Sequence, residues 1–344
     1  MSEYTPEPLS PPAAAVPQTP SNPTSQRQRA SQLAQALRQE LHKALIGQNA
    51  VVDDVLTALI AGGHVLIEGV PGLGKTLLVR ALARCFGGEF ARIQFTPDLM
   101  PSDVTGHAVY DLHSEQFKLR KGPVFTNLLL ADEINRAPAK TQAALLEVMQ
   151  ERQVTLEGRA LAVPLPFMVL ATQNPIDQEG TYTLPEAQLD RFLLKIRVTY
   201  PTPVEERMVL DAMATSAPKL DVSQVTDVTA ISASRVVVND LFMDEKIRDY
   251  IVALIHATRH PEALAPHLKL LIRCGASPRG TINLALAAKA LAFLNGRNYV
   301  IPQDIKDLAP DILRHRILLS YEAEAEGVTT DDVVKTLLDK LPVP

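Results

Sequence analysis

Residues 69–76 read Gly-Val-Pro-Gly-Leu-Gly-Lys-Thr and match the pattern GxxxxGK[ST]. An apolar stretch at 64–68 precedes the pattern and a helical segment at 75–85 follows it, which is the strand–loop–helix context of phosphate-binding loops. Glycines let backbone N–H groups surround a phosphate, and the start of the helix adds partial positive charge. Lys75 would reach the β- and γ-phosphates of a nucleotide. The predicted nucleotide-binding residues are Gly69, Val70, Pro71, Gly72, Leu73, Gly74, Lys75, Thr76 and Leu77.

A second apolar stretch, at 128–131, leads directly into two carboxylates, Asp132 and Glu133. Asp132 at the end of a strand can hold Mg²⁺ through water, together with the hydroxyl of Thr76. Glu133 can polarise a water molecule that attacks a phosphate. A small-molecule kinase does not need this second carboxylate, because its nucleophile is the substrate. The pair therefore favours hydrolysis, although an apolar strand that ends in Asp is common by itself.

Three further polar residues occupy positions where they could act on the same phosphate. Asn174 follows an apolar stretch at 167–172, where its amide could orient the attacking water, but Asn-Pro is also ordinary turn chemistry. Arg191 lies near the end of an expected helix at 185–192, and Arg279 lies at the start of another. Most arginines are solvated or paired with a carboxylate, so the residues alone leave both interpretations open.

Apolar runs and helical segments alternate between Gly63 and Val198. We expect strands at 64–68, 90–95, 128–131, 167–172 and 193–198, and helices at 75–85, 139–151 and 185–192. Continuously apolar strands indicate burial on both faces, hence an α/β fold with a mainly parallel sheet. After about Tyr200 helices dominate, at 203–213, 244–258, 278–294, 302–314 and 329–341. The predicted organisation is a disordered Pro-rich tail (1–26), a nucleotide-binding α/β domain (27–200) and an all-α domain (201–344).

The composition restricts the partners and the compartment. A net charge of −5 and a pI near 5.9 argue against a general attraction to nucleic acid or anionic membranes. No stretch approaches the ~18 uninterrupted apolar residues of a membrane helix, and the N-terminus lacks the regions of a signal peptide. Cys85 and Cys274 lie far apart, which is typical of a reducing compartment. We expect a cytoplasmic protein with no membrane insertion and no nucleic-acid partner.

The chain resembles the AAA+ ATPases in a set of motifs that occur in a fixed order: the phosphate-binding loop, Asp132-Glu133, Asn174, Arg191 and Arg279. More narrowly, the chain is similar to the MoxR family from about residue 30 to the C-terminus. The segments that carry this resemblance are Ile46–Gln48, Arg92–Pro101 (RIQFTPDLMP), Asp132–Pro138 (DEINRAP), Ala171–Gly180 (ATQNPIDQEG), Leu184–Phe192 (LPEAQLDRF), Gly275–Arg279 (GASPR), Gly296–Val300 (GRNYV) and Leu313–Ile317 (LRHRI).

The resemblance implies roles for individual residues. Asn174 matches the sensor-1 position, and Arg279 matches the sensor-2 arginine that contacts the γ-phosphate from the lid. Arg191 matches the arginine finger that is supplied to a neighbouring subunit. Arg136 is an alternative trans-acting arginine, or else a structural contact between subunits. With Glu133 as the base, the implied catalytic residues are Glu133, Asn174, Arg191 and Arg279.

The same resemblance extends to the ligands and the surface. Ile46, Gly47 and Gln48 match the segment that lines the adenine pocket, so ATP and Mg²⁺ are the implied cofactors, with the metal held by Thr76 and Asp132. The long connection at 96–122 resembles an insertion in helix 2, and 152–164 resembles a hairpin that precedes sensor 1. Both would face the ring pore or a partner, or remain plain surface loops.

The resemblance implies a homo-oligomeric ring, expected to be a hexamer, with an AAA+ core and an all-α lid. ATP hydrolysis would drive chaperone-like remodelling or maturation of a client protein, often with a partner that contains a von Willebrand factor A domain. The identity of the client does not follow from the sequence. Alternatives on the same fold are a nucleic-acid motor or remodeller, a magnesium chelatase-like subunit, and a non-hydrolysing nucleotide-gated scaffold. Glu133 and Arg191 argue against the scaffold.

Overall fold

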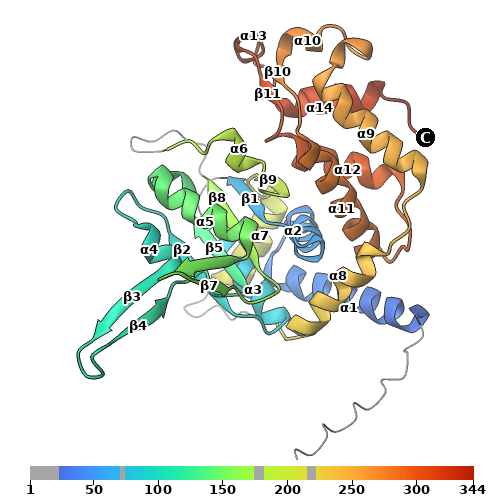
Figure 1. The fold of residues 1–344 in the computed structure, drawn as a ribbon. Coiled ribbons are helices and arrows are strands. Elements are labelled where there is room, and N and C mark those ends of the chain that lie inside the picture. The colour runs from blue at the N-terminus through green and yellow to red at the C-terminus, as the bar shows by residue number, and fades with distance from the viewer. Residues whose placement is uncertain (1–22, 70–73, 174–181, 215–221) are drawn as a thin grey trace, which may run out of the picture.

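A five-stranded sheet forms the centre of the computed structural model, which describes residues 23–69, 74–173, 182–214 and 222–344 (Figure 1). The strands in spatial order are β2 (Phe90–Gln94), β5 (Leu128–Asp132), β8 (Met168–Gln173), β1 (Val65–Gly69) and β9 (Leu194–Val198). Every neighbouring pair is parallel. The predicted α/β fold with a parallel sheet is confirmed, and each expected strand agrees with the observed one to within one residue at either end.

Alternate residues of the strands enter two separate apolar cores. Val65 and Ile67 belong to one core, and Leu66 between them belongs to the other, because successive side chains of a strand point to opposite faces. The helices on the first face are α1 (Pro23–Ala44), α2 (Asn49–Ala61) and α3 (Lys75–Cys85), and α5 (Ala139–Glu151) packs on the second. Burial on both faces explains why the strands are continuously apolar.

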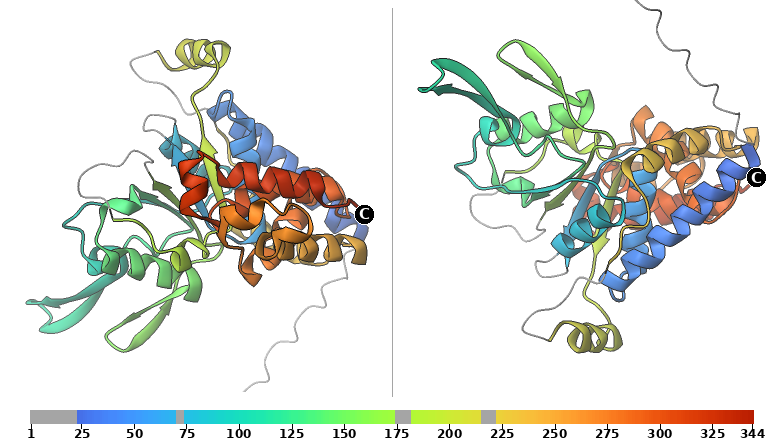
Figure 2. Two further views of the ribbon diagram at one scale, coloured as in Figure 1. Left: turned by 90° about the horizontal axis from the view of Figure 1, so that it is seen from above. Right: turned by 90° about the horizontal axis from the view of Figure 1, so that it is seen from below.

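Two hairpins project from the same side of the sheet (Figure 2). The first lies in the expected insertion at 96–122 and consists of α4 (Pro101–Thr105), β3 (Gly106–Asp111) and β4 (Gln116–Lys121). The second, at the expected 152–164 hairpin, pairs β6 (Gln153–Leu156) with β7 (Arg159–Ala162). A short 3-10 turn, η1 (Ile134–Arg136), connects β5 to α5.

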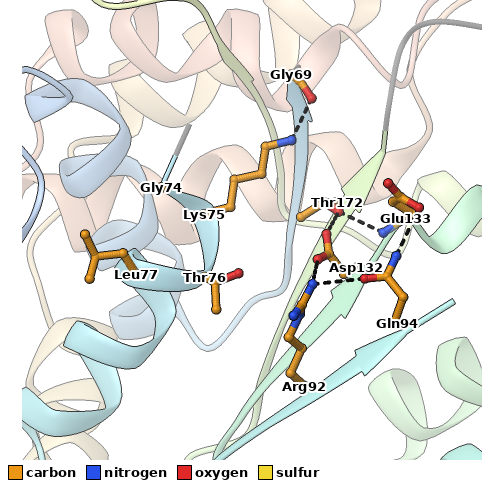
Figure 3. Close-up of a pocket in the computed structure, with 10 residues that line it drawn as sticks. All are labelled: Gly69, Gly74, Lys75, Thr76, Leu77, Arg92, Gln94, Asp132, Glu133 and Thr172. Carbon is orange, nitrogen blue, oxygen red and sulfur yellow. Dashed lines mark hydrogen bonds and ion pairs between the residues drawn. The ribbon is translucent and has the colours of Figure 1, made fainter. Parts of the chain in front are cut away.

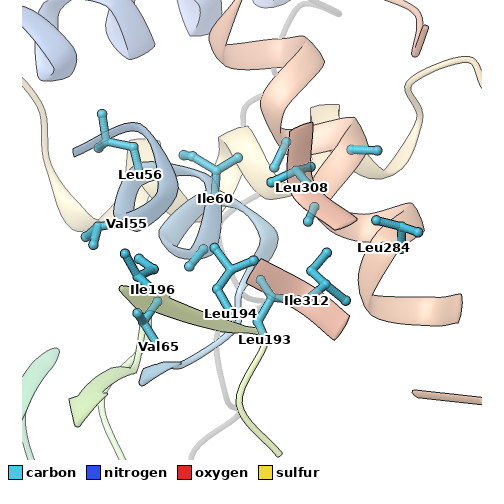
Figure 4. Packing of buried hydrophobic residues seen from close by; sticks show 14 of the residues in the cluster. Val55, Leu56, Ile60, Val65, Leu193, Leu194, Ile196, Leu284, Leu308 and Ile312 are labelled. Atoms are coloured by element: carbon cyan, nitrogen blue, oxygen red, sulfur yellow. The ribbon is translucent and has the colours of Figure 1, made fainter. Parts of the chain in front are cut away.

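Helices make up most of the chain after β9. They are α7 (Pro203–Met213), α8 (Val228–Asn239), α9 (Glu245–Arg259), α10 (Leu268–Leu271), α11 (Pro278–Leu294), α12 (Pro302–Leu313), α13 (Tyr321–Ala325) and α14 (Thr330–Lys340), with the turn η2 (Pro261–Ala263) and the small pair β10 (Ile272–Cys274) and β11 (Leu318–Leu319). Ile60 of α2, Leu194 of β9 and Ile312 of α12 belong to one apolar cluster (Figure 4). The helical region is therefore docked on the sheet through a continuous core. Within the described ranges, none of the helices has an apolar stretch long enough to span a bilayer.

The structure differs from the expectation at several places. The first helix begins at Pro23, inside the expected tail at 1–26, and residues 1–22 lie outside the described residues. The helices α2 and α8 were not predicted. The expected helix at 185–192 is a single turn, α6 (Glu186–Leu189). Beyond it the backbone bonds follow the tighter i→i+3 pattern, from Arg191 to Gln188 and from Phe192 to Leu189. A buried arginine from the helical region, Arg316, bonds the backbone oxygens of Asp190 and Phe192.

His64 connects the start of β1 to two other elements. Its Nδ1 accepts the backbone N–H of Val169 at 2.9 Å, so Nε2 carries the hydrogen and donates to the Met149 carbonyl at 3.1 Å. Burial lowers the pKa of His64 to about 4, and the charges of Arg152 and Arg235 act in the same direction. A second proton on Nδ1 would face an N–H donor, so the ring is held neutral.

We expect His64 to make the protein less stable in acid. The unfolded histidine titrates near its ordinary pKa of 6.5 and the folded one near 4, so the free energy of unfolding falls as the pH drops through that window. Between pH 7 and pH 5 the loss should be about 2 kcal/mol. Urea unfolding of the wild type and of His64→Gln at both pH values measures it. An equal pH dependence of the two proteins would contradict the assignment.

Candidate active site

A pocket of about 470 Å³ opens where four parallel strands end (Figure 3). Its lining residues are Gly69, Gly74, Lys75, Thr76, Leu77, Arg92, Gln94, Asp132, Glu133 and Thr172. Gly69 ends β1, Gln94 ends β2 and Asp132 ends β5. Parallel pairing places the carboxyl ends of all these strands at one edge, which is where α/β sheets bind ligands. Seven of the predicted site residues thus meet in one pocket.

The phosphate-binding loop enters the pocket through Gly74 and Lys75. Gly74 precedes α3 with φ +75°, a left-handed conformation that glycine adopts without a steric cost. The Lys75 ammonium donates to the Gly69 carbonyl at 2.6 Å. Partial burial lowers the pKa of Lys75, while the charges of Asp132 and Glu133 oppose that effect. Val70, Pro71, Gly72 and Leu73 lie outside the described residues.

The hydroxyl of Thr172 joins the carboxylate of Asp132 to the backbone of Glu133. Thr172 Oγ1 donates to Asp132 Oδ1 at 2.6 Å and accepts the backbone N–H of Glu133 at 2.8 Å. Glu133 itself has φ +56° and ψ +50°, a left-handed conformation that is uncommon for a side-chain-bearing residue and clusters at functional sites. This turn takes Glu133 off the line of β5, and the hydroxyl of Thr172 holds it there.

The sequence prediction named Arg136 as an alternative trans-acting arginine but missed Arg92 and Gln94, which also surround these carboxylates. Arg92 donates to Asp132 Oδ2 at 2.6 Å, and the amide of Gln94 donates to Glu133 Oε2 at 3.0 Å. Arg136 donates to the same oxygen of Glu133 at 2.9 Å. The alternation of side chains along β2 could have indicated Arg92 and Gln94. They lie on either side of the buried Ile93, so both side chains are on the other face of the strand.

The pocket residues fit a magnesium ion. Thr76 and Asp132 line the same pocket and offer oxygen atoms, which Mg²⁺ prefers. Within the described residues no group of three or more His, Cys, Asp or Glu side chains could hold a metal. The usual Mg²⁺ site of a nucleotide-binding protein has one or two protein ligands, which act together with substrate phosphates and water.

The remaining predicted residues do not line this pocket. Asn174 lies outside the described residues. Arg279 is in the first turn of α11, as expected, and its guanidinium lies 3.7 Å from Asp190. Arg191 lies two residues beyond α6, and its Nε is buried with no hydrogen-bond partner among the described residues.

The predicted adenine segment, Ile46, Gly47 and Gln48, forms the turn from α1 to α2 and is also not among the lining residues. Gly47 has φ +80°, and a Cβ there would lie only 2.6 Å from the Glu205 side chain. Glu205 belongs to the capping box at the start of α7. The turn therefore packs closely against the chain that leaves β9.

Comparison with known proteins agrees with this geometry. Residues 64–194 match the family described as "ATPase family associated with various cellular activities (AAA)", and residues 265–337 match the AAA lid domain. Chaperone MoxR1 of Mycobacterium tuberculosis is 46% identical over 306 residues, which are 89% of this chain and 81% of that protein. The chain belongs to the MoxR family of AAA+ ATPases. The recognition made from the sequence motifs is confirmed.

Further relatives of this MoxR-family chain cover almost its whole described length. Protein MoxR of Methylorubrum extorquens is 31% identical over 331 residues, 90% of this chain and 95% of that protein. The crystal structure of a candidate ATPase from Cytophaga hutchinsonii superposes with a TM-score of 0.89 at 44% identity, over 93% of this chain and 98% of that one. The AAA+ core followed by a helical lid is therefore the fold of the chain.

Asp190 joins the lid to the segment that carries Arg191. One carboxylate oxygen accepts from Arg316 at 2.8 Å, and the other accepts from the Ser277 hydroxyl at 2.8 Å. The Arg316 side chain is 1% exposed and also donates to the Phe192 carbonyl at 2.5 Å. Burial lowers the pKa of Arg316 to about 10, against the opposing charge of Asp190. This guanidinium therefore determines the backbone path on both sides of Arg191.

Replacing Arg316 should loosen this junction. We expect Arg316→Met to lower the free energy of unfolding by about 3–5 kcal/mol, because it removes the nearer, buried cation from a largely buried carboxylate, which then keeps only the cation of Arg279, at 3.7 Å. The matched control is Arg273→Met, since Arg273 also joins the lid to this segment, through Glu186 at 3.0 Å, but both side chains are more than half exposed. The control should cost less than about 1 kcal/mol. Equal losses in urea unfolding would show that burial of the pair is unimportant.

Proposed function

We propose that this chain hydrolyses ATP in the pocket at the four strand ends. The observation that carries the proposal is the convergence of Lys75, Thr76, Asp132 and Glu133 on one pocket around Thr172 (Figure 3). A phosphate-binding loop alone serves many reactions. The left-handed Glu133 beside Asp132 adds a carboxylate that can act on water, and membership of an ATPase family agrees with this chemistry.

In the proposed reaction, Lys75 exchanges the Gly69 carbonyl for phosphate oxygens, a stronger charge-assisted bond. Gln94 and Arg136 both donate to Oε2 of Glu133, which leaves Oε1 to accept a proton from the attacking water. The water oxygen bonds to the γ-phosphorus, the bond to the bridging oxygen breaks, and ADP and phosphate leave. Thr76 and Asp132 would hold Mg²⁺, which would neutralise part of the phosphate charge.

The base is tested by Glu133→Gln. This variant should bind ATP within about threefold of the wild type, because the amide keeps the shape of the side chain. Turnover should fall by about 10²–10⁴-fold, the usual contribution of a general base. Phosphate release and equilibrium nucleotide binding measure the two quantities.

Glu147→Gln, an exposed glutamate of α5, provides the matched control and should keep wild-type turnover. Turnover of Glu133→Gln within threefold of the wild type, a difference of only ~0.65 kcal/mol in activation free energy, would exclude Glu133 as the base.

The proposed active form is a homo-oligomeric ring, a hexamer, in which Arg191 acts on the ATP of the neighbouring subunit. The unpartnered Nε of Arg191, on a segment positioned by Asp190 and Arg316, supports this role. Arg279 would leave Asp190 for the γ-phosphate when the lid closes. Arg136 contacts Glu133 of its own subunit, which favours Arg191 as the trans-acting residue.

A mixing experiment tests the trans role. Arg191→Ala and Lys75→Ala should each be nearly inactive, since an arginine finger contributes about 10³–10⁵ in rate to GTPases. In mixed rings an intact loop from the first variant can face an intact Arg191 from the second, so part of the activity should return. Native mass spectrometry shows whether the rings are mixed. If no activity returns in mixed rings, Arg191 acts within its own subunit, and Arg136 becomes the next candidate for the trans-acting arginine.

The proposed work of the ring is remodelling or maturation of a client protein, with a von Willebrand factor A domain protein as partner. The name of the relative Chaperone MoxR1 supports such work. The projecting hairpin β3–β4 offers a surface for it, because Leu112 and Phe117 are 82% and 74% exposed and the Phe117 ring packs edge-on against Tyr110. An exposed apolar tip suits contact with protein better than with nucleic acid.

A further inference from the structure

We propose that Arg92 is an internal counter-cation for Asp132, which Mg²⁺ must displace when nucleotide and metal bind. This inference deepens the proposed function and rests on it, because it takes the pocket as a site for both ligands. Arg92 then determines how strongly nucleotide binding depends on the metal. It is a positioning residue, since it acts through Asp132 and makes or breaks no bond.

The contact arises from the register of two neighbouring strands. Gln94 of β2 lies opposite Asp132 of β5, so Arg92, two residues earlier on the same face, points along the sheet toward the carboxylate. Its Nη2 lies 2.6 Å from Oδ2 of Asp132 and 3.0 Å from Oε1 of Gln94. Oδ1 of Asp132 accepts from Thr172. Both oxygens of Asp132 are therefore already engaged by the chain itself (Figure 3).

A metal ion and a guanidinium compete for this carboxylate. Mg²⁺ or one of its bound waters needs an oxygen of Asp132, and a like charge held against the same oxygen repels the ion. The Arg92 side chain is 47% exposed, whereas that of Asp132 is 19% exposed and tied to Thr172. Arg92 can therefore withdraw into solvent on its long stem, while the carboxylate stays at the end of β5.

The pairing also affects nucleotide that arrives without metal. With Arg92 in place, the charge of Asp132 is compensated and repels the phosphates less. Without Arg92, the carboxylate should repel metal-free phosphates and attract Mg²⁺ more strongly. Loss of Arg92 is therefore expected to weaken nucleotide binding in the absence of metal and to strengthen it in the presence of metal.

The experiment measures binding rather than turnover. Calorimetric titration gives the Kd of the full chain and of Arg92→Gln for the non-hydrolysable analogue AMP-PNP, in EDTA and in excess Mg²⁺. The ratio of the Kd in EDTA to the Kd in Mg²⁺ should be about fivefold larger in the variant, the upper range for a part-exposed ion pair. The Kd in Mg²⁺ should itself be lower than that of the wild type.

Arg136→Gln is the matched control, because it removes one positive charge beside the same carboxylates but from Glu133 instead of Asp132. Its ratio should stay within twofold of the wild type. In an Asp132→Asn background, Arg92→Gln should no longer change the ratio, because the shared partner is gone.

Three results would overturn the inference. An equal change in both arginine variants would indicate a general charge effect. Equal weakening with and without metal would make Arg92 a plain phosphate contact, and an unchanged ratio would make the ion pair irrelevant to the metal. In each of these cases the wild type still binds nucleotide and the proposed function stands. A wild-type chain that binds no AMP-PNP in either buffer would overturn both.

Discussion

The parallel pairing of β2, β5, β8 and β1 determines where the chemistry of this protein lies. Because the strands run in one direction, the residues at or next to their ends meet at one edge, although up to 103 positions separate them in the sequence; they are Gln94, Asp132, Thr172 and Gly69. The sheet stays rigid because apolar cores cover both faces. Thr172 then links the carboxylate of Asp132, at the end of the neighbouring strand, to the backbone N–H of Glu133. The geometry of the pocket thus follows from backbone register more than from any single loop.

A second constraint couples this edge to the lid. The apolar core on the first face continues through α2 and β9 into α11 and α12, so the lid shares its packing with the sheet. At the polar end of the same junction, Asp190 contacts Arg316, Ser277 and, at 3.7 Å, Arg279. These three residues belong to the lid, while Asp190 is adjacent to Arg191. Movement of the lid should therefore also move the segment that carries Arg191, the predicted arginine finger.

The sequence predicted the elements whose pattern is local and missed those determined by distant contacts. The strands, α3, α5, α7 and α11 follow from apolar runs and proline starts. The helix α2 is apolar on nearly every side, so it shows no amphipathic stripe. The expected helix at 185–192 stops at Leu189, and the carbonyls just beyond it bond an arginine more than 120 positions away. Lys75, Thr76, Asp132 and Glu133 were recognisable from motifs, whereas Arg92 and Gln94 needed the register of β2 against β5.

In the proposed reaction, the distribution of charge in the pocket gives the nucleotide phosphates and the metal ion different requirements for binding. In this reaction, the pair of Asp132 with Arg92 must be weakened before this carboxylate can act on metal, because Thr172 occupies its other oxygen. Glu133 is paired with Arg136 through Oε2 and keeps Oε1 for water. Lys75 instead donates to the neutral carbonyl of Gly69, a partner that a phosphate oxygen readily replaces because the new bond joins opposite charges. In the proposed reaction the phosphates would therefore bind to Lys75 first, with little rearrangement. Their negative charge would then attract Mg²⁺ to the same edge of the sheet, where the ion competes with Arg92 for Asp132, so that nucleotide binding itself favours release of this carboxylate.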